Sequence, residues 1–96
     1  TISVGDIAND PGYYDGKTIT VRTYVKSSPT TSYNTTSLSV GDTYENLRVE
    51  TENSELIPVL INGDFIEITG TLRFDTYWFS YEIKLENETH KVEIIS

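Results

Sequence analysis

Cationic and aromatic side chains recur at alternate positions in several short stretches of this sequence. The stretch Lys17–Lys26 alternates apolar residues with Arg22, Tyr24 and Lys26. Because side chains on a strand point alternately to opposite faces, these three share the face opposite the apolar one. Guanidinium and ammonium groups bind anions, and aromatic rings stack on other flat rings. The stretch therefore predicts a strand with one buried face and one face suited to binding.

The same types of side chain lie on the outward faces of later predicted strands. Arg48 faces outward on the third strand, Arg73 ends the fourth, and Trp78 opens the fifth beside a loop that holds Tyr77. Tyr33 lies in the loop after the first strand. Five of the seven basic residues are predicted to face outward on strands: Arg22, Lys26, Arg48, Arg73 and Lys84. The candidate binding residues are Arg22, Tyr24, Lys26, Tyr33, Arg48, Arg73, Tyr77 and Trp78.

Each candidate also has a purely structural interpretation. Outward cations can pair across strands with glutamates that share their faces, namely Glu50, Glu67 and Glu82. The large rings can lie over the mouth of the core or pack back onto their loops. The residues alone leave both interpretations open.

Catalytic and metal chemistry find little support in the sequence. His90 is the only histidine and there is no cysteine, so neither a histidine relay nor a typical zinc site can form. No spacing singles out an acid–base pair among the 15 acidic residues, and there is no Gly-rich phosphate loop. We therefore expect no enzyme activity, cofactor or metal, and we expect His90 at the surface.

Five alternating segments predict the strands that position the candidates. They span residues 17–28, 37–40, 47–50, 66–73 and 78–85, and a short last strand is expected around Val92 and Ile94. The fifth segment is expected to turn Phe79 inward and Glu82 outward. Gly70 lies within the fourth segment, where glycine often marks a bend or a close backbone approach.

The connections are predicted to be mostly irregular. Ser27–Thr36 is polar and has no periodicity, so it is expected to be an exposed loop. One helical turn is expected at Gly5–Ala8. Asn53 can cap a helix before the fourth strand, but Pro58 keeps that helix short or absent. Five strands with this break suggest a small closed barrel, because closure removes the exposed edges of an open sheet.

Two stretches also resemble a known family. Asp15–Arg22 and Asn62–Leu72 are similar to the first and fourth strands of OB-fold domains, most of all the oligonucleotide-binding domains of replication protein A and its archaeal relatives. The resemblance implies an all-β, five-stranded Greek-key barrel. It also implies non-enzymatic binding of single-stranded DNA or RNA on strands 2–3 and the loops joining strands 1–2 and 4–5. Two departures are Thr23, where such domains often have glycine, and the glycine-free turn Asp42–Asn46.

Composition bounds the remaining possibilities. Ninety-six residues make a single domain, 1–96, and the absence of methionine predicts one excised from a longer chain. No apolar run is long enough to span a membrane, and a cytoplasmic location is expected. The net charge of −8 argues against strong bulk attraction to nucleic acid. It favours, as the alternative, a protein-interaction or structural domain of a larger protein. A sandwich domain of an exported protein is the third alternative.

Overall fold

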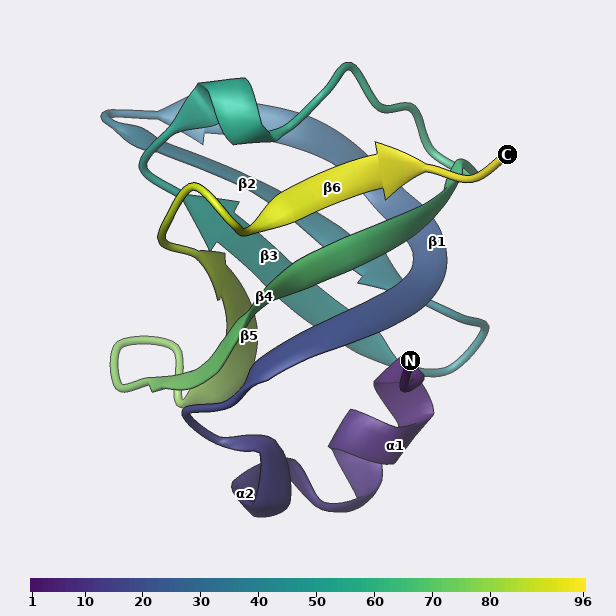
Figure 1. The fold of residues 1–96 in the computed structure, drawn as a ribbon, viewed down its shortest axis with the longest axis vertical. Coiled ribbons are helices and arrows are strands. Elements are labelled where there is room, and N and C mark those ends of the chain that lie inside the picture. Colours follow the sequence, from purple (N-terminus) through teal and green to yellow (C-terminus); the bar gives the residue numbers. More distant parts are fainter.

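The computed structural model describes residues 1–96, whose strands form a closed barrel around the core (Figure 1). The strands are β1 (Thr18–Ser32), β2 (Thr35–Gly41), β3 (Asn46–Thr51), β4 (Phe65–Asp75), β5 (Ser80–Leu85) and β6 (Lys91–Ile94). Their order is β1-β2-β3-β5-β4, a second pairing of β1 with β4 closes the barrel, and β6 is added beside β4. Only β3 and β5 run parallel. This is the predicted five-stranded OB-fold barrel, with one extra strand.

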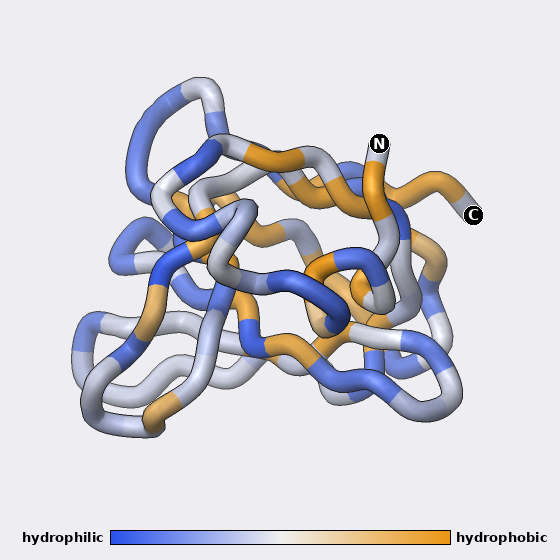
Figure 2. Tube along the Cα trace, turned by 90° about the horizontal axis from the view of Figure 1, so that it is seen from below, coloured by the Kyte–Doolittle hydropathy of each residue, from blue (hydrophilic) through white to orange (hydrophobic).

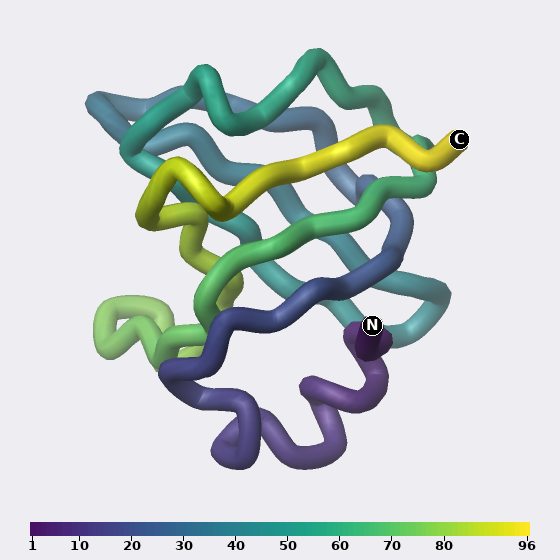
Figure 3. The backbone as a smooth tube through the Cα atoms, viewed as in Figure 1, coloured from purple at the N-terminus to yellow at the C-terminus, as the bar shows by residue number.

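The first strand is long enough to take part in two pairings. Residues 18–24 pair with β4, and the rest of β1 pairs with β2 from Tyr24 onward. The path of β1 therefore curves around the barrel, as the trace in Figure 3 shows. Thr23, which stands where a glycine was expected, is buried at this curve. The strand bends here with a β-branched residue instead.

Gly70 allows β4 and β5 to approach closely, as its position in the fourth strand suggested. A Cβ atom at this position would lie 2.7 Å from Cγ2 of Ile83 and 2.9 Å from the carbonyl oxygen of Lys84. No side chain fits there without moving β5. The glycine therefore sets the spacing of the two strands that lead into and out of the β4–β5 loop.

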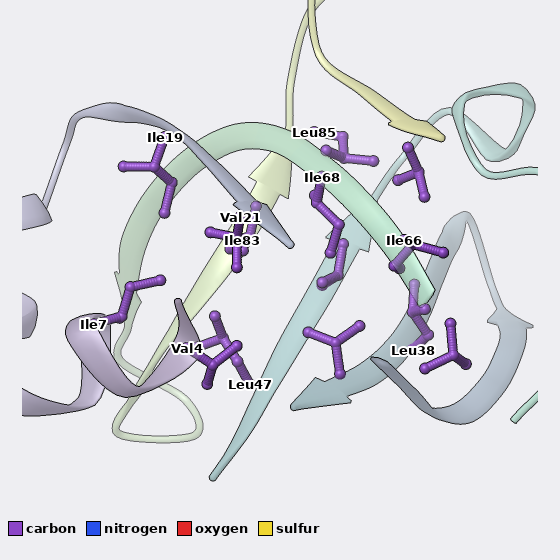
Figure 4. Packing of buried hydrophobic residues seen from close by; sticks show 14 of the residues in the cluster. Val4, Ile7, Ile19, Val21, Leu38, Leu47, Ile66, Ile68, Ile83 and Leu85 are labelled. Atoms are coloured by element: carbon purple, nitrogen blue, oxygen red, sulfur yellow. The ribbon is translucent and has the colours of Figure 1, made fainter. Parts of the chain in front are cut away.

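The core fills the barrel with aliphatic side chains from every strand (Figure 4). At one end, α1 (Val4–Asn9) inserts Val4 and Ile7 against this core, and α2 (Pro11–Tyr14) follows. Helix α1 is two residues longer than the predicted turn because Ser3 and Asp6 form a reciprocal capping box at its start. A 3₁₀ turn, η1 (Ser54–Leu56), lies between β3 and β4, as the short-helix prediction required.

The loop predicted for Ser27–Thr36 was wrong. β1 and β2 continue as a hairpin to its tip at Tyr33 and Asn34. The pairing is irregular between Ser27 and Thr30, so Pro29 lies where no regular ladder hydrogen bond is required. The irregular register also removed the alternation that would have identified a strand.

Two further placements differ from expectation. Phe79 is 80% exposed with a φ of 52°, because β5 begins only at Ser80 and Phe79 belongs to the preceding turn. His90 is 2% exposed, and its Nδ1 accepts a hydrogen bond of 2.8 Å from the backbone N–H of Glu86. That contact fixes the turn between β5 and β6, so His90 has a structural role there.

The surface of the barrel is polar along most of its loops, which are blue or white in Figure 2. None of the helices combines the length and the apolar character that crossing a membrane requires.

Candidate nucleic-acid interface

The loop between β4 and β5 displays two aromatic rings. The Asp75 carboxylate accepts hydrogen bonds from the backbone N–H groups of Tyr77 (2.8 Å) and Trp78 (3.0 Å). The bond from Trp78 is the main reason that the pKa of Asp75 lies below its ordinary value. The Tyr77 and Trp78 rings meet edge to face, 4.9 Å apart, and remain 81% and 58% exposed. A carboxylate at the end of β4 thus holds this pair of rings toward solvent.

Arg48 connects this loop to the outer surface of β3. Its guanidinium carbon lies 5.8 Å from the centroid of the Trp78 ring, within cation–π range. The same guanidinium lies 3.1 Å from a Glu50 oxygen and 3.4 Å from a Glu82 oxygen. Arg48 is therefore shared between one ring and two carboxylates. We call Arg48, Tyr77 and Trp78 the Trp78 region.

The charges beside this region alternate across three neighbouring strands. In register, Arg48 on β3 lies opposite Glu82 on β5, and Glu82 lies opposite Arg73 on β4. Two residues further along β3 and β5, Glu50 lies opposite Lys84. The Nζ of Lys84 is 3.0 Å from a Glu50 oxygen and 3.5 Å from a Glu82 oxygen. The Glu50 contact raises the pKa of Lys84. Positive and negative side chains thus neutralise one another on the outer face.

Glu82 is the unusual member of this array. It lies on the outer face, as predicted, yet it has no exposed surface, and no group donates a hydrogen bond to either carboxylate oxygen. Burial, and then the proximity of Glu50 and Asp75, raise the pKa of Glu82 to about 8. For Glu50, burial alone would raise the pKa, but contacts with Glu82, Lys84 and Arg48 outweigh it and lower the pKa. A protonated Glu82 can donate a hydrogen bond to a neighbouring carboxylate.

The carboxylates of Glu50, Asp75 and Glu82 have the composition of a divalent-cation site, since one oxygen from each lies within 4.8 Å of the others. Arg48 and Lys84 already contact this group. Three carboxylates and two cations carry a net charge of −1, which a single proton on Glu82 removes. The local charge therefore favours a proton over a metal ion.

A second pairing of a ring with a cation lies elsewhere on the barrel. Tyr24 is 49% exposed, and its ring packs 4.9 Å from that of Phe65. The Nζ of Lys26 donates a hydrogen bond of 2.6 Å to the backbone carbonyl of Asp42 and forms no ion pair. We call Tyr24, Lys26 and Phe65 the Tyr24 region.

The structure does not bring the two regions into contact. Tyr24 pairs with Phe65, the first residue of β4, whereas Trp78 lies three residues after Asp75, the last. The bend of β1 and the β4–β5 loop lie on opposite flanks in Figure 1. The predicted binding residues are therefore distributed over two surfaces.

The remaining predicted residues are dispersed. Arg22 on β1 pairs across the strands with Glu67 on β4 at 2.8 Å, and Arg73 contacts Glu86 at 2.9 Å. Tyr33 is 99% exposed at the tip of the β1–β2 hairpin. The ion pairs predicted as the structural alternative are thus present for Arg22 and Arg48, whereas Arg73 pairs with Glu86 instead and Lys26 forms no ion pair. The rings of Tyr24 and Trp78 remain accessible.

An acidic groove lies next to the charge array. It has a volume of about 570 Å³ and runs between the start of β2, the ends of β3 and β5, and the turn that follows β5. Its lining residues are Thr35, Glu50, Thr51, Glu52, Asn53, Leu56, Lys84, Leu85, Glu86, Asn87 and Glu88. Four of the lining side chains are carboxylates that favour a cationic ligand over a phosphate.

Comparison with solved structures identifies other proteins with this fold. A Leishmania major Friedlin protein described as an aspartyl-tRNA synthetase matches with a TM-score of 0.76 and 12% identity, over 99% of this chain and 20% of its own. The HINb domain of p204 matches with a TM-score of 0.68 and 11% identity, over 84% and 41%. Asparaginyl-tRNA synthetase from Pyrococcus horikoshii, complexed with asparaginyl-adenylate, matches with a TM-score of 0.67 and 15% identity, over 88% and 20%.

These likenesses show a shared fold. The chain spans about a fifth of the length of the two synthetase chains and less than half of the HINb chain. No protein-family model matches the sequence, and no curated protein matches it.

Proposed function

We propose that this OB-fold domain is a non-enzymatic module that binds single-stranded DNA or RNA. The observation that carries the proposal is the contact of Arg48 with Trp78 on the outer surface of β3. OB-folds bind oligonucleotides on strands 2–3 and on the loops that join strands 1–2 and 4–5. Arg48 lies on the third strand, Trp78 in the loop between β4 and β5, and Tyr33 at the β1–β2 tip.

The Trp78 region supplies the two contacts that single-strand binders combine. Bases stack on Trp78 and Tyr77, and a phosphate meets Arg48; stacking of this kind contributes about 1–3 kcal/mol per base. Arg73 extends this surface across β4. Arg22, Tyr24 and Lys26 contact the ligand only if the single-stranded nucleic acid continues around the barrel to the bend of β1. The sequence resemblance to replication protein A domains supports the same ligand class. We further propose that the domain works in the cytoplasm, beside other domains of a longer protein.

The ion pairs predict that binding is weak. A phosphate that reaches Arg48 must compete with two carboxylates that already contact it. The net charge of −8 adds long-range repulsion of a polyanion, which salt screens. We therefore expect dissociation constants of about 10⁻⁴ M or weaker at physiological salt, as for non-specific binding.

Fluorescence anisotropy with labelled oligo-dT and oligo-rU at low salt tests this proposal. Binding that weakens as salt rises is expected, because phosphate contacts release counterions. Absence of binding at about millimolar protein, or binding that does not respond to salt, contradicts the proposal.

The acidic groove favours a second candidate function, recognition of a basic segment of another domain or protein. Four carboxylates line it, and Lys84 is the only lining cation. Titration with a Lys-rich peptide tests this candidate. Binding that is weakened by Glu52→Gln and Glu88→Gln supports it, whereas peptide binding that is unchanged in both variants contradicts it.

A further inference from the structure

We propose that nucleic-acid binding at the Trp78 region is coupled to the uptake of one proton by the carboxylate of Glu82. This inference rests on the proposed function and concerns its regulation. The coupling makes the domain bind more tightly as pH falls through the mildly alkaline range.

Geometry places Glu82 where it controls the charge available to a phosphate. Arg48, which contacts Trp78, also contacts the Glu82 carboxylate at 3.4 Å. The carboxylate is buried and accepts no hydrogen bond, and its charge is offset only by Arg48 at 3.4 Å and Lys84 at 3.5 Å, both shared with Glu50. Any change in its protonation is therefore felt directly by the guanidinium that is proposed to meet the ligand.

The other charged groups around Glu82 come from all three strands. β3 contributes Arg48 and Glu50, β5 contributes Lys84, and β4 contributes Asp75 together with Arg73, which lies opposite in register but contacts Glu86. Lys84 is already held at 3.0 Å by Glu50. With Glu82 ionised, the Glu50–Asp75–Glu82 group and its two contacting cations carry a net charge of −1, and with Glu82 neutral they carry none.

The direction of the coupling follows from this count. A phosphate placed near Arg48 repels an ionised Glu82 and favours its protonated form, so the bound state holds the proton more tightly. By linkage, protonation must favour binding to the same extent. The free protein already has a pKa of about 8 at Glu82, which places the effect in an accessible pH range. The affinity is highest below this pKa and falls as pH rises through it.

Affinity for oligo-dT measured from pH 7 to pH 9.5 at constant ionic strength tests the coupling, in the unmodified protein, Glu82→Gln and Glu93→Gln. The glutamine at position 82 imitates the neutral form, and Glu93 pairs with Lys91 on β6, away from this group. If binding raises the pKa of Glu82 by about one unit, affinity falls by up to about tenfold. The same fall in affinity is expected for Glu93→Gln. For Glu82→Gln, the affinity is expected to stay constant to within about twofold across this pH range.

The possible outcomes separate the two proposals. A flat profile in the unmodified protein, or an equal slope in Glu82→Gln, overturns the coupling and leaves nucleic-acid binding in place. No binding by any variant at any pH overturns the proposed function and the coupling together. Carbon-13 NMR of the Glu82 carboxyl group gives an independent measurement of its pKa. The midpoint of its pH titration must rise when oligo-dT is added, and an unchanged midpoint overturns the coupling.

Discussion

The Trp78 region and the Tyr24 region each combine an exposed ring with a cation on the outer surface of one barrel, yet only the Trp78 region neutralises its cation with carboxylates. Arg48 lies between the carboxylates of Glu50 and Glu82, whereas Lys26 donates to a backbone carbonyl. Five of the seven basic side chains are held in ion pairs: Arg22, Arg48, Arg73, Lys84 and Lys91. The number of outward cations therefore overstates the positive charge that a ligand meets.

The two regions are also expected to differ in how far their contribution to binding depends on pH. The Tyr24 region has a ring packed on Phe65 and no buried charge, so its contribution to binding should depend little on pH. The Trp78 region pairs its ring with a guanidinium that contacts a buried, unsatisfied carboxylate. Under the proposed coupling, this arrangement would weaken binding at high pH. The predictions below test the difference between the two regions.

The largest expected difference is in the loss of stacking. Trp78→Ala should weaken oligo-dT binding by about 1–3 kcal/mol, roughly five- to 150-fold, because it removes the ring that contacts Arg48. Tyr24→Ala should have a smaller effect, since its ring already packs against Phe65. Anisotropy titrations at one low salt concentration measure both. An equal or larger loss in Tyr24→Ala would move the principal binding surface to the bend of β1.

The next effect concerns stability. The folded protein raises the pKa of Glu82 from its ordinary 4.5 to about 8, so its favourable contribution is complete below pH 4.5 and is lost as pH rises through 8. Glu82→Gln removes this dependence and should stabilise the protein at pH 9 relative to pH 4.5 by a few kcal/mol, since each unit of pKa shift corresponds to about 1.4 kcal/mol. Urea denaturation at the two pH values measures it. Parallel pH dependence in both proteins contradicts the assignment.

Charge removal should give a moderate effect that differs between the regions in its pH response. Arg48→Gln and Lys26→Gln should each lower the slope of log affinity against log salt by about one if each meets one phosphate. Only Arg48→Gln should also flatten the pH profile, because Lys26 has no contact with Glu82. Salt titrations at pH 7 and pH 9 provide both readouts. If the slope of log affinity against log salt is unchanged in Arg48→Gln, Arg48 does not contact a phosphate.

The smallest effect is expected at Arg22. Its ion pair with Glu67 is partly exposed, and surface pairs contribute about 0–1 kcal/mol. Arg22→Gln should therefore change both the free energy of unfolding and the affinity for oligo-dT only slightly. A loss comparable to that of Trp78→Ala would show that the nucleic acid follows β1 and β4 instead.

Much of the fold could be predicted because it depends on local alternation. The buried positions of β1, β2, β3 and β4 follow the period-two pattern, and Gly70 marked the close approach of β5. The hairpin at Ser27–Thr36 could not be found this way, because an irregular register around Pro29 broke the pattern. Phe79 was misplaced because the Asp75 carboxylate starts a turn, and β5 therefore begins two residues later than predicted, at Ser80.

The candidate site was predictable only in its parts. Outward alternation placed Arg48 correctly, whereas Trp78, predicted to open the fifth strand, lies in the turn before β5. The contact of the two side chains depends on the path of the β4–β5 loop. The burial of Glu82 depends on which strands lie on either side of β5, and a single strand pattern does not contain this information. His90 was misplaced for a different reason, because a local hydrogen bond from the backbone N–H of Glu86, four residues earlier, draws its ring into the turn.

Chemical-shift mapping by NMR during titration with oligo-dT at low salt tests the central claim most directly. The account predicts the largest shifts at the indole N–H of Trp78, at Tyr77 and at the side chain of Arg48, with smaller shifts along β3 and at Tyr33. Shifts that are absent from these residues, or that are confined to β6 and the two N-terminal helices, would contradict the claim that the β3 face and the β4–β5 loop bind nucleic acid.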